Sequence, residues 1–291
     1  MKYIVLGKTG YIGEAFVNYF NTISQPYVAL SRSDKNYTNV SVFKDYLESI
    51  RDDDIAVINC AGYIGKPNVD ACEGAKAETI AGNVVFPAQL ATTCEQLEIP
   101  LIHISSGCIY GGYEKDFTEM DKPNFTFPTG SFYSGTKALA ETLVASNCSR
   151  YYIYRLRIPF DHICSPRNYI TKLLTYDRLL DMRNSVSHRY DFVKYCHKLT
   201  EQRVPYGIYN VTNRGSITTR DVVDMLHNLL PAQDKVFTFF DTIEQFGNET
   251  VAPRSNCVLN TDKIEKYIDI RTANQAMEHA ILRYKDDCVA S

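Results

Sequence analysis

The chain has 291 residues, of which 45% are hydrophobic, so it can bury a sizeable core and is expected to be globular. Its 31 basic and 34 acidic residues give a formal net charge of −3 without any dense basic cluster, which argues against nucleic acid or an anionic membrane as partner. The nine cysteines form no Cys-x-x-Cys pair, which argues against a disulfide framework or a metal site. The first strand-like segment begins at Lys2 and no apolar run approaches about 18 residues, so we expect a cytoplasmic protein.

Apolar strands alternate with amphipathic helices in the first half of the chain. Strands are predicted at 3–6, 27–30, 55–59, 100–105 and 151–157, with helices between them, most clearly at 77–96 and 131–146. This alternation predicts right-handed crossover units and a parallel sheet covered on both faces. We therefore predict an α/β fold with a doubly wound Rossmann sheet over residues 1–157, completed by about 186–228.

The pattern loosens after residue 158. Helices are predicted at 168–182, 189–202, 218–230 and near 273–285, with a strand at 207–212. We expect residues 158–185 and 229–291 to form a smaller C-terminal substrate-binding lobe that completes a cleft.

A glycine-rich turn, "GKTGYIG", follows the first predicted strand directly. Gly7, Gly10 and Gly13 suit a tight turn, close approach to a pyrophosphate and close helix packing, although glycines also occur in turns for steric reasons alone. The turn therefore predicts dinucleotide binding. The expected cofactor contacts are Gly7, Thr9, Gly10, Tyr11, Ile12 and Gly13 in this turn, with Cys60, Ala61 and Gly62 after the third strand.

The second strand ends in "ALSRSDK", without the acidic residue that would bind an adenosine ribose. Ser31 and Arg32 stand at that position, and an arginine is suited to bidentate capture of a 2′-phosphate. We therefore predict NADPH rather than NADH. The alternative is a solvated surface arginine.

Tyr133 and Lys137 lie four residues apart on one face of a predicted helix, where the ammonium would lower the pKa of the phenol. Together with the glycine turn, "NCAG" (59–62) and "SSGCIYG" (105–111), this pair resembles the extended short-chain dehydrogenase/reductases that act on nucleotide-sugars. The resemblance covers essentially the whole chain. It implies that Ser106, Tyr133 and Lys137 are the catalytic serine, tyrosine and lysine.

Three longer segments narrow the resemblance: "GKPNVDACE" (65–73), "SPRNYITK" (165–172) and "APRSNCVLNTDK" (252–263). They are similar to the bifunctional 3,5-epimerase/4-reductases that complete UDP-L-rhamnose synthesis in plants and some large viruses. The resemblance implies a UDP-sugar substrate, and for a viral chain the host cytoplasm as location.

The related 4,6-dehydratases carry Thr-Asp-Glu where this chain has Ser106, Gly107 and Cys108, so dehydration is not expected. By the resemblance, Cys108 and Lys172 are the candidate pair for epimerisation, and a thiol beside an ammonium is a competent base. The alternatives are a buried filler cysteine and a lysine that faces water.

Further substrate contacts are predicted around this pair. Asn68 and Asp70 would bind sugar hydroxyls, Asn168 the diphosphate, and Arg254 a phosphate. The alternatives are turn or cap roles for the two asparagines, a helix cap for Asp70 and a surface ion pair for Arg254. The expected substrate contacts are Lys66, Asn68, Asp70, Ser106, Gly107, Cys108, Arg167, Asn168, Lys172 and Arg254.

Asn83 either joins a backbone relay to Lys137 or bonds within its own helix. Rival functions are a 4-keto-rhamnose reductase without epimerase activity and a non-catalytic NADP-binding regulatory subunit. A homodimer is the general expectation for such a protein.

Overall fold

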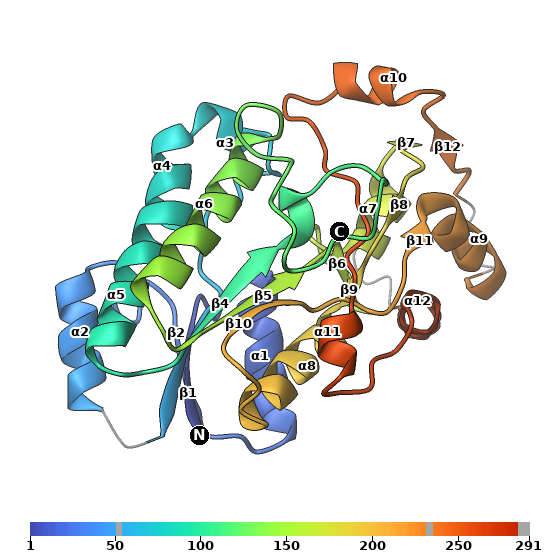
Figure 1. Ribbon diagram of the computed structural model, residues 1–291. Coiled ribbons are helices and arrows are strands. Elements are labelled where there is room, and N and C mark those ends of the chain that lie inside the picture. The colour runs from blue at the N-terminus through green and yellow to red at the C-terminus, as the bar shows by residue number, and fades with distance from the viewer. Residues whose placement is uncertain (51–53, 231–234, 285–291) are drawn as a thin grey trace.

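The computed structural model describes residues 1–50, 54–230 and 235–284, and its centre is a six-stranded sheet (Figure 1). The strands follow the order β10-β5-β4-β3-β1-β2. Their bounds are β1 (Lys2–Leu6), β2 (Tyr27–Leu30), β3 (Ile55–Asn59), β4 (Leu101–Ser106), β5 (Tyr151–Leu156) and β10 (Gly207–Asn210). Every pairing in this sheet is parallel, which confirms the predicted doubly wound α/β fold.

The parallel arrangement brings the carboxyl ends of the strands to one edge of the sheet. The strand order reverses between β1 and β3, and in open α/β sheets a ligand crevice forms outside the strand ends at such a reversal. The glycine turn follows β1 and the Ser106 segment follows β4. Both therefore lie at the edge where a ligand would bind.

Helices cover both faces of the sheet (Figure 1). Tyr3 and Val5 of β1 point to a core shared with α1 (Tyr11–Thr22) and α8 (Arg189–Glu201). Ile4 and Leu6 point the other way, to a core shared with α2 (Val40–Ser49), α5 (Phe86–Gln96) and α6 (Phe132–Asn147). Because both faces are buried, the strands are continuously apolar rather than alternating.

The long helix predicted at 77–96 is not uniform. After the short α3 (Ala71–Gly74), the chain forms α4 (Lys76–Ile80), a single π-helical turn η1 (Ala81–Val85) and then α5 without a break. Such π turns contain wider hydrogen-bonded rings and are frequent at functional sites. This one carries Asn83, which is 2% exposed.

The rest of the chain forms the C-terminal lobe, in which the helix predicted at 168–182 is too long. The helix α7 ends at Thr175 because the chain then forms β7, which pairs with β12. The lobe elements are β6 (Pro159–Phe160), α7 (Tyr169–Thr175), β7 (Arg178–Leu179), β8 (Arg183–Asn184), β9 (Ser187–His188), β11 (Ile217–Thr218), α9 (Thr219–Leu229), β12 (Thr238–Phe239), α10 (Ile243–Asn248), α11 (Asp262–Glu265) and α12 (Ala273–Ile281).

A third core lies under most of these elements, whereas Ile264 of α11 belongs to the core that α1 and α8 share with the sheet. Leu173 of α7, Leu226 of α9 and Met277 of α12 belong to the third core, so α9 packs with the lobe although it falls within the segment predicted to complete the sheet domain. Residues 231–234 and 285–291 of the predicted lobe lie outside the described residues. No helix in the described ranges is both long and apolar enough to cross a membrane.

Candidate active site

A cavity of about 1370 Å³ lies at the carboxyl edge of the sheet and extends to the C-terminal lobe. It brings most of the predicted site residues together: Gly7, Thr9, Gly10, Tyr11, Ile12, Arg32, Cys60, Ala61, Gly62, Lys66, Asn68, Asp70, Ser106, Cys108, Tyr133, Lys137, Arg167, Lys172 and Arg254. Four predicted residues are not among its walls, namely Gly13, Ser31, Gly107 and Asn168.

The glycine turn after β1 leaves no room for side chains. Gly7 has a φ of +82°, and a Cβ there would stand 2.9 Å from the backbone nitrogen of Ala61. A Cβ on Gly13 would stand 2.1 Å from the carbonyl oxygen of Gly7, so this glycine packs α1 against the turn rather than lining the cavity. The first N–H groups of α1 therefore lie beside a turn whose glycines carry no bulky side chains, which suits an anionic pyrophosphate.

At the end of β2, Arg32 faces the cavity and Ser31 does not. The backbone N–H and hydroxyl of Ser31 both donate to the carboxylate of Asp34, at 2.8 and 2.7 Å. Lys8 pairs with the same carboxylate at 2.7 Å, and these bonds hold the pKa of Asp34 well below its ordinary value. The Asp34 carboxylate is thus engaged by Ser31 and Lys8, whereas Arg32 lines the cavity.

Asn83 fills neither of its two expected roles. Its Oδ1 accepts the backbone N–H of Tyr63 at 2.7 Å, while its Nδ2 donates to the Tyr63 carbonyl at 2.8 Å and to Thr136 at 3.3 Å. The asparagine therefore joins the loop after β3 to helix α6. It positions that loop, whose Gly62 lines the cavity.

Lys137 is held firmly beneath the cavity. The side chain is 7% exposed, and Nζ donates to the carbonyl of Ile104 at 2.9 Å and lies 3.5 Å from Nε2 of His103. His103 in turn lies 3.2 Å from Nδ2 of Asn59. Burial lowers the pKa of Lys137, and negative charge on neighbours such as Cys108 acts in the opposite direction. The amine is therefore fixed in place on helix α6.

The expectation that Lys137 lowers the pKa of Tyr133 is wrong for this structure. Burial raises the pKa of Tyr133, and charge on Cys108 and Cys72 raises it further. The phenol is therefore neutral at neutral pH, which is the form that can donate a proton. Its hydroxyl has no hydrogen-bond partner among the residues that the structure describes.

The segment after β4 presents a thiol to the cavity. Ser106 caps the short 3-10 turn η2 (Gly107–Ile109), its hydroxyl accepting the backbone N–H of Cys108 at 3.2 Å. Gly107 lies behind the wall, where a Cβ would stand 2.6 Å from Leu259. Cys108 is a free thiol that lines the cavity. The tight turn thus places the cysteine in the wall of the cavity.

Helix α7 carries Lys172 into the same cavity. Burial lowers the pKa of Lys172, and the charges of Arg254 and Arg167 lower it further. Its Nζ forms no hydrogen bond or ion pair within the described ranges. Asn168 is fully buried at the start of this helix, where it accepts the N–H of Ile170 at 3.1 Å. Asn168 is therefore the N-cap of α7, which is the alternative role given for it in the sequence prediction.

Asp70 and Arg254 pair with each other across the cavity wall. Two bonds join the carboxylate to the guanidinium, at 2.7 and 2.8 Å, and Asp70 also accepts the N–H of Ala252 at 2.9 Å. The Arg254 guanidinium holds the pKa of Asp70 below its usual range. Asp70 does not cap the following helix, whereas Asn68 does form the expected turn by accepting the Asp70 N–H at 2.8 Å.

Several residues around the cavity are not predicted from the sequence. His103 and Asn59 lie behind Lys137 on apolar strands, where a polar residue within an apolar run is a signal that could have been followed. Tyr176, Arg178, Phe246 and Glu249 form a far end of the cavity. They stand in segments without any motif, so no local signal identifies them.

A doubly wound sheet, a glycine turn shaped for a dinucleotide and a Tyr-x-x-x-Lys pair in one cavity define the class of short-chain dehydrogenase/reductases. The family model described as the RmlD substrate binding domain matches residues 1–285. The chain belongs to this family.

Curated relatives include enzymes with more than one activity. A bifunctional dTDP-4-dehydrorhamnose 3,5-epimerase/dTDP-4-dehydrorhamnose reductase of Arabidopsis thaliana is 33% identical over 275 residues, which are 91% of this chain and 86% of the relative. A trifunctional UDP-glucose 4,6-dehydratase/UDP-4-keto-6-deoxy-D-glucose 3,5-epimerase/UDP-4-keto-L-rhamnose-reductase of the same plant is 31% identical. The match covers 91% of this chain and 39% of that longer protein.

Solved structures agree with the fold. The L780 UDP-rhamnose synthase of Acanthamoeba polyphaga mimivirus superposes with a TM-score of 0.87 and 26% identity, over 97% of this chain and 99% of that one. A dTDP-4-dehydrorhamnose reductase of Bacillus anthracis in complex with NADP gives a TM-score of 0.82 at 17% identity, over 97% and 98% of the two chains. The second likeness concerns the fold alone.

Proposed function

We propose that this chain converts UDP-4-keto-6-deoxy-D-glucose to UDP-L-rhamnose, by epimerisation at C3 and C5 followed by NADPH-dependent reduction of the C4 ketone. One observation carries the proposal. A single cavity holds the Tyr133 and Lys137 pair together with Cys108 and Lys172. The tips of Tyr133, Cys108 and Lys172 have no hydrogen-bond partner in the described part of the chain, so all three are available to a substrate.

Epimerisation uses the acidity that the ketone gives to its neighbouring carbons. One group of the Cys108 and Lys172 pair removes the proton from C3, and the electron pair moves to the C4 oxygen as an enolate. The other group returns a proton on the opposite face, and the same sequence follows at C5. The lowered pKa of Lys172 supports this role because it increases the neutral amine that can take up a proton.

Reduction uses the buried pair on helix α6. The dinucleotide supplies a hydride to C4 when bound, and Tyr133 donates its hydroxyl proton to the ketone oxygen. The raised pKa of Tyr133 keeps the phenol protonated until then. Ser106 orients the ketone oxygen, and Lys137 holds the nicotinamide ribose. NADPH is the proposed cofactor because Arg32 is available for a 2′-phosphate.

The test follows deuterium and NADPH together. Purified protein is incubated with UDP-4-keto-6-deoxy-D-glucose in D2O, with and without NADPH, and deuterium at C3 and C5 is followed beside NADPH absorbance. Wild type should exchange both positions and produce UDP-L-rhamnose. Cys108→Ala should lose the exchange and still reduce a ketone that was epimerised beforehand.

Cys60→Ala is the matched control. Cys60 lines the same cavity, but burial raises the pKa of its thiol, so this variant should keep the exchange. If wild type consumes NADPH without exchange, the protein is only a reductase and Cys108 is a packing residue. Tight NADP binding without any reduction would instead favour the regulatory subunit.

A further inference from the structure

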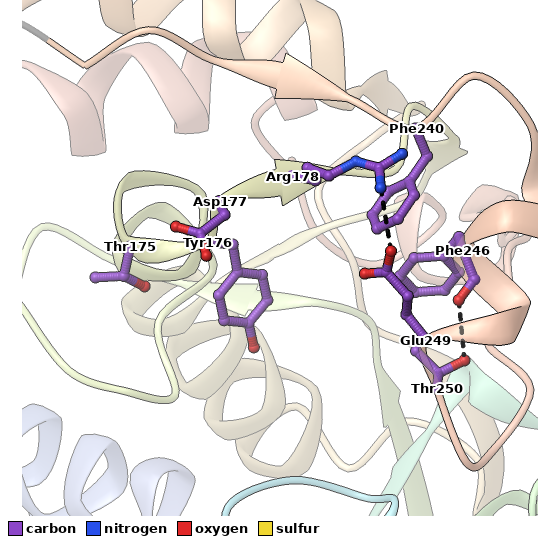
Figure 2. A pocket seen from close by; sticks show the side chains of 8 residues that line it. All are labelled: Thr175, Tyr176, Asp177, Arg178, Phe240, Phe246, Glu249 and Thr250. Carbon is purple, nitrogen blue, oxygen red and sulfur yellow. Dashed lines mark hydrogen bonds and ion pairs between the residues drawn. The ribbon is translucent and has the colours of Figure 1, made fainter.

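A chain of buried polar groups lies behind the sheet-side wall of the cavity. At the far end of the cavity, Figure 2 shows Arg178 paired with Glu249, and both side chains are exposed, so water can complete their hydrogen bonds. On the sheet side, by contrast, Asn59 and His103 are fully buried. Buried groups of this kind are satisfied by their neighbours, so a donor and an acceptor can be assigned to each contact.

The amide of Asn59 is oriented by a backbone donor. Asn59 ends β3, and its Oδ1 lies 3.0 Å from the backbone nitrogen of Ala61, a group that can only donate. The amide oxygen therefore faces Ala61, and Nδ2 faces Nδ1 of His103 at 3.2 Å. Asn59 and His103 are direct neighbours in the register of β3 and β4, which holds the two side chains together.

This contact limits His103 to one tautomer. An amide nitrogen only donates, so Nδ1 of His103 is the acceptor and carries no proton. Burial keeps the pKa of His103 well below its usual value, so the ring is neutral and its one exchangeable proton is on Nε2. That N–H lies next to Nζ of Lys137, with 3.5 Å between the two nitrogens.

A neutral amine can accept this hydrogen bond, whereas an ammonium cannot. A neutral Nζ of Lys137 has two N–H groups and one lone pair. One N–H donates to the carbonyl of Ile104 at 2.9 Å, and the lone pair accepts the Nε2–H of His103. The second N–H is left for a ligand of the cavity that Lys137 lines. Burial lowers the pKa of Lys137 and so acts in the same direction.

The acidic neighbours of Lys137 oppose this preference only weakly. Negative charge on Cys108, Glu141 or Cys60 favours the ammonium. The carboxylate of Glu141, however, is paired with Arg155 at 2.6 Å. Burial raises the pKa of Cys60, so that thiol is neutral at neutral pH, and Cys108 acts only when its thiol is ionised.

The hydrogen bonds therefore run in one direction, from Ala61 through Asn59 and His103 to Lys137. On the basis of the proposed function, we infer that Asn59 and His103 are positioning residues that hold Lys137 as a neutral amine and thereby keep Tyr133 protonated for ketone reduction. An ammonium at this place would favour the phenolate, which has no proton to donate.

The tautomer of His103 is measured first, by ¹⁵N NMR of the NADP-loaded protein without substrate. An Ile-His pair occurs once in the sequence, so His103 can be assigned through Ile102. Wild type should carry the proton on Nε2. Asn59→Asp should move it to Nδ1, because the carboxylate accepts the Ala61 N–H with one oxygen and the Nδ1–H with the other. The bare Nε2 then accepts from Lys137, which becomes an ammonium.

The pH profile of ketone reduction reports the resulting charge of Lys137. In Asn59→Asp the ammonium favours the ionised form of Tyr133, so the alkaline limb of kcat/KM should move to lower pH than in wild type. If Asn59 merely supported the fold, the substitution would lower kcat/KM at every pH and leave the limb in place.

Asn21→Asp is the matched control. Asn21 is exposed near the end of α1, and its Oδ1 accepts the hydroxyl of Tyr27 at 2.8 Å, a bond that a carboxylate keeps. This variant adds the same negative charge outside the chain of hydrogen bonds. It should change neither the tautomer of His103 nor the pH profile.

Three results overturn the inference: a proton on Nδ1 of His103 in wild type, an unchanged tautomer in Asn59→Asp, or a changed tautomer with an unchanged pH profile. If Asn59→Asp does not fold, the wild-type tautomer decides alone. The failure of the proposed function is a separate result, in which the tautomer changes as predicted while the 4-keto sugar is not reduced by any of the proteins.

Discussion

The two walls of the cavity are held in different ways. On the sheet side, Lys137 is 7% exposed and bonded to Ile104, and behind it Glu141 and Arg155 form a buried ion pair at 2.6 Å. On the lobe side, Lys172 has no partner in the described ranges, and the Arg178 and Glu249 side chains are 40% and 55% exposed. Under the proposed function, the wall that would align a hydride donor with a ketone is preorganised, whereas the wall that would bind the sugar leaves Lys172 unpaired within the described part of the chain.

The largest expected effect is on the sheet side, in Tyr133→Phe. Loss of the proton donor should lower the rate of ketone reduction by roughly 10²–10⁴-fold, measured from NADPH absorbance. Deuterium exchange at C3 and C5 should persist, because it depends on Cys108 and Lys172. Equal loss of both activities would mean that the two reactions share a proton donor.

Glu141→Gln tests how firmly the sheet wall is fixed. Removing one partner of a buried pair leaves the Arg155 guanidinium uncompensated, so the free energy of unfolding should fall by about 3–5 kcal/mol in denaturant titrations. Ser105, which donates to the same carboxylate at 2.5 Å, loses an ionised acceptor as well.

Glu249→Gln is the matching change on the lobe side. Its pair with Arg178 is exposed, so the free energy of unfolding should change by about 0–1 kcal/mol. Similar losses in Glu141→Gln and Glu249→Gln would contradict the contrast between the walls.

Arg32→Gln should affect the cofactor and leave the substrate unaffected. A lost charge-assisted bond to the 2′-phosphate should raise the KM for NADPH by about tenfold or more, while the KM for NADH stays the same. Lys35→Gln serves as control, since Lys35 lies over the ring of Tyr46, away from the cavity. If the KM values for NADH and NADPH rise alike, Arg32 does not bind the 2′-phosphate.

The smallest expected effect is a shift in pH dependence. Burial and the charges of Arg254 and Arg167 lower the pKa of Lys172, so Arg254→Gln should raise it again. The neutral amine then forms at higher pH, so the rise in the rate of deuterium exchange should move to higher pH. A profile that does not move would argue against Lys172 as the base.

The sequence predicts the sheet well because its signals are local. Strands predicted at 27–30 and 55–59 have those bounds in the structure, since continuous apolar runs between turns identify buried parallel strands. The helix predicted at 168–182 is too long because Arg178 and Leu179 pair with β12, a partner some 60 residues away. Apolar periodicity carries no information about such distant pairing.

The site features divide in the same way, into those that local spacing predicts and those that depend on contacts between distant segments. The glycine turn and the Tyr133 and Lys137 pair follow from spacing within one segment. The Asp70 and Arg254 pair joins residues 184 positions apart, and the raised pKa of Tyr133 depends on how many atoms surround the phenol. Neither can be predicted before the chain has folded.

The π turn at Ala81–Val85 limits the mutations that the loop after β3 can tolerate. A Cβ on Gly82 would come within 3.1 Å of Cβ of Tyr63, and one on Gly62 within 3.0 Å of Oδ1 of Asn83. The loop and the π turn are therefore packed so closely that neither Gly62 nor Gly82 has space for a methyl group. Deleting one residue of the turn would restore α-helical spacing, rotate Asn83 by about 100° and withdraw it from the loop.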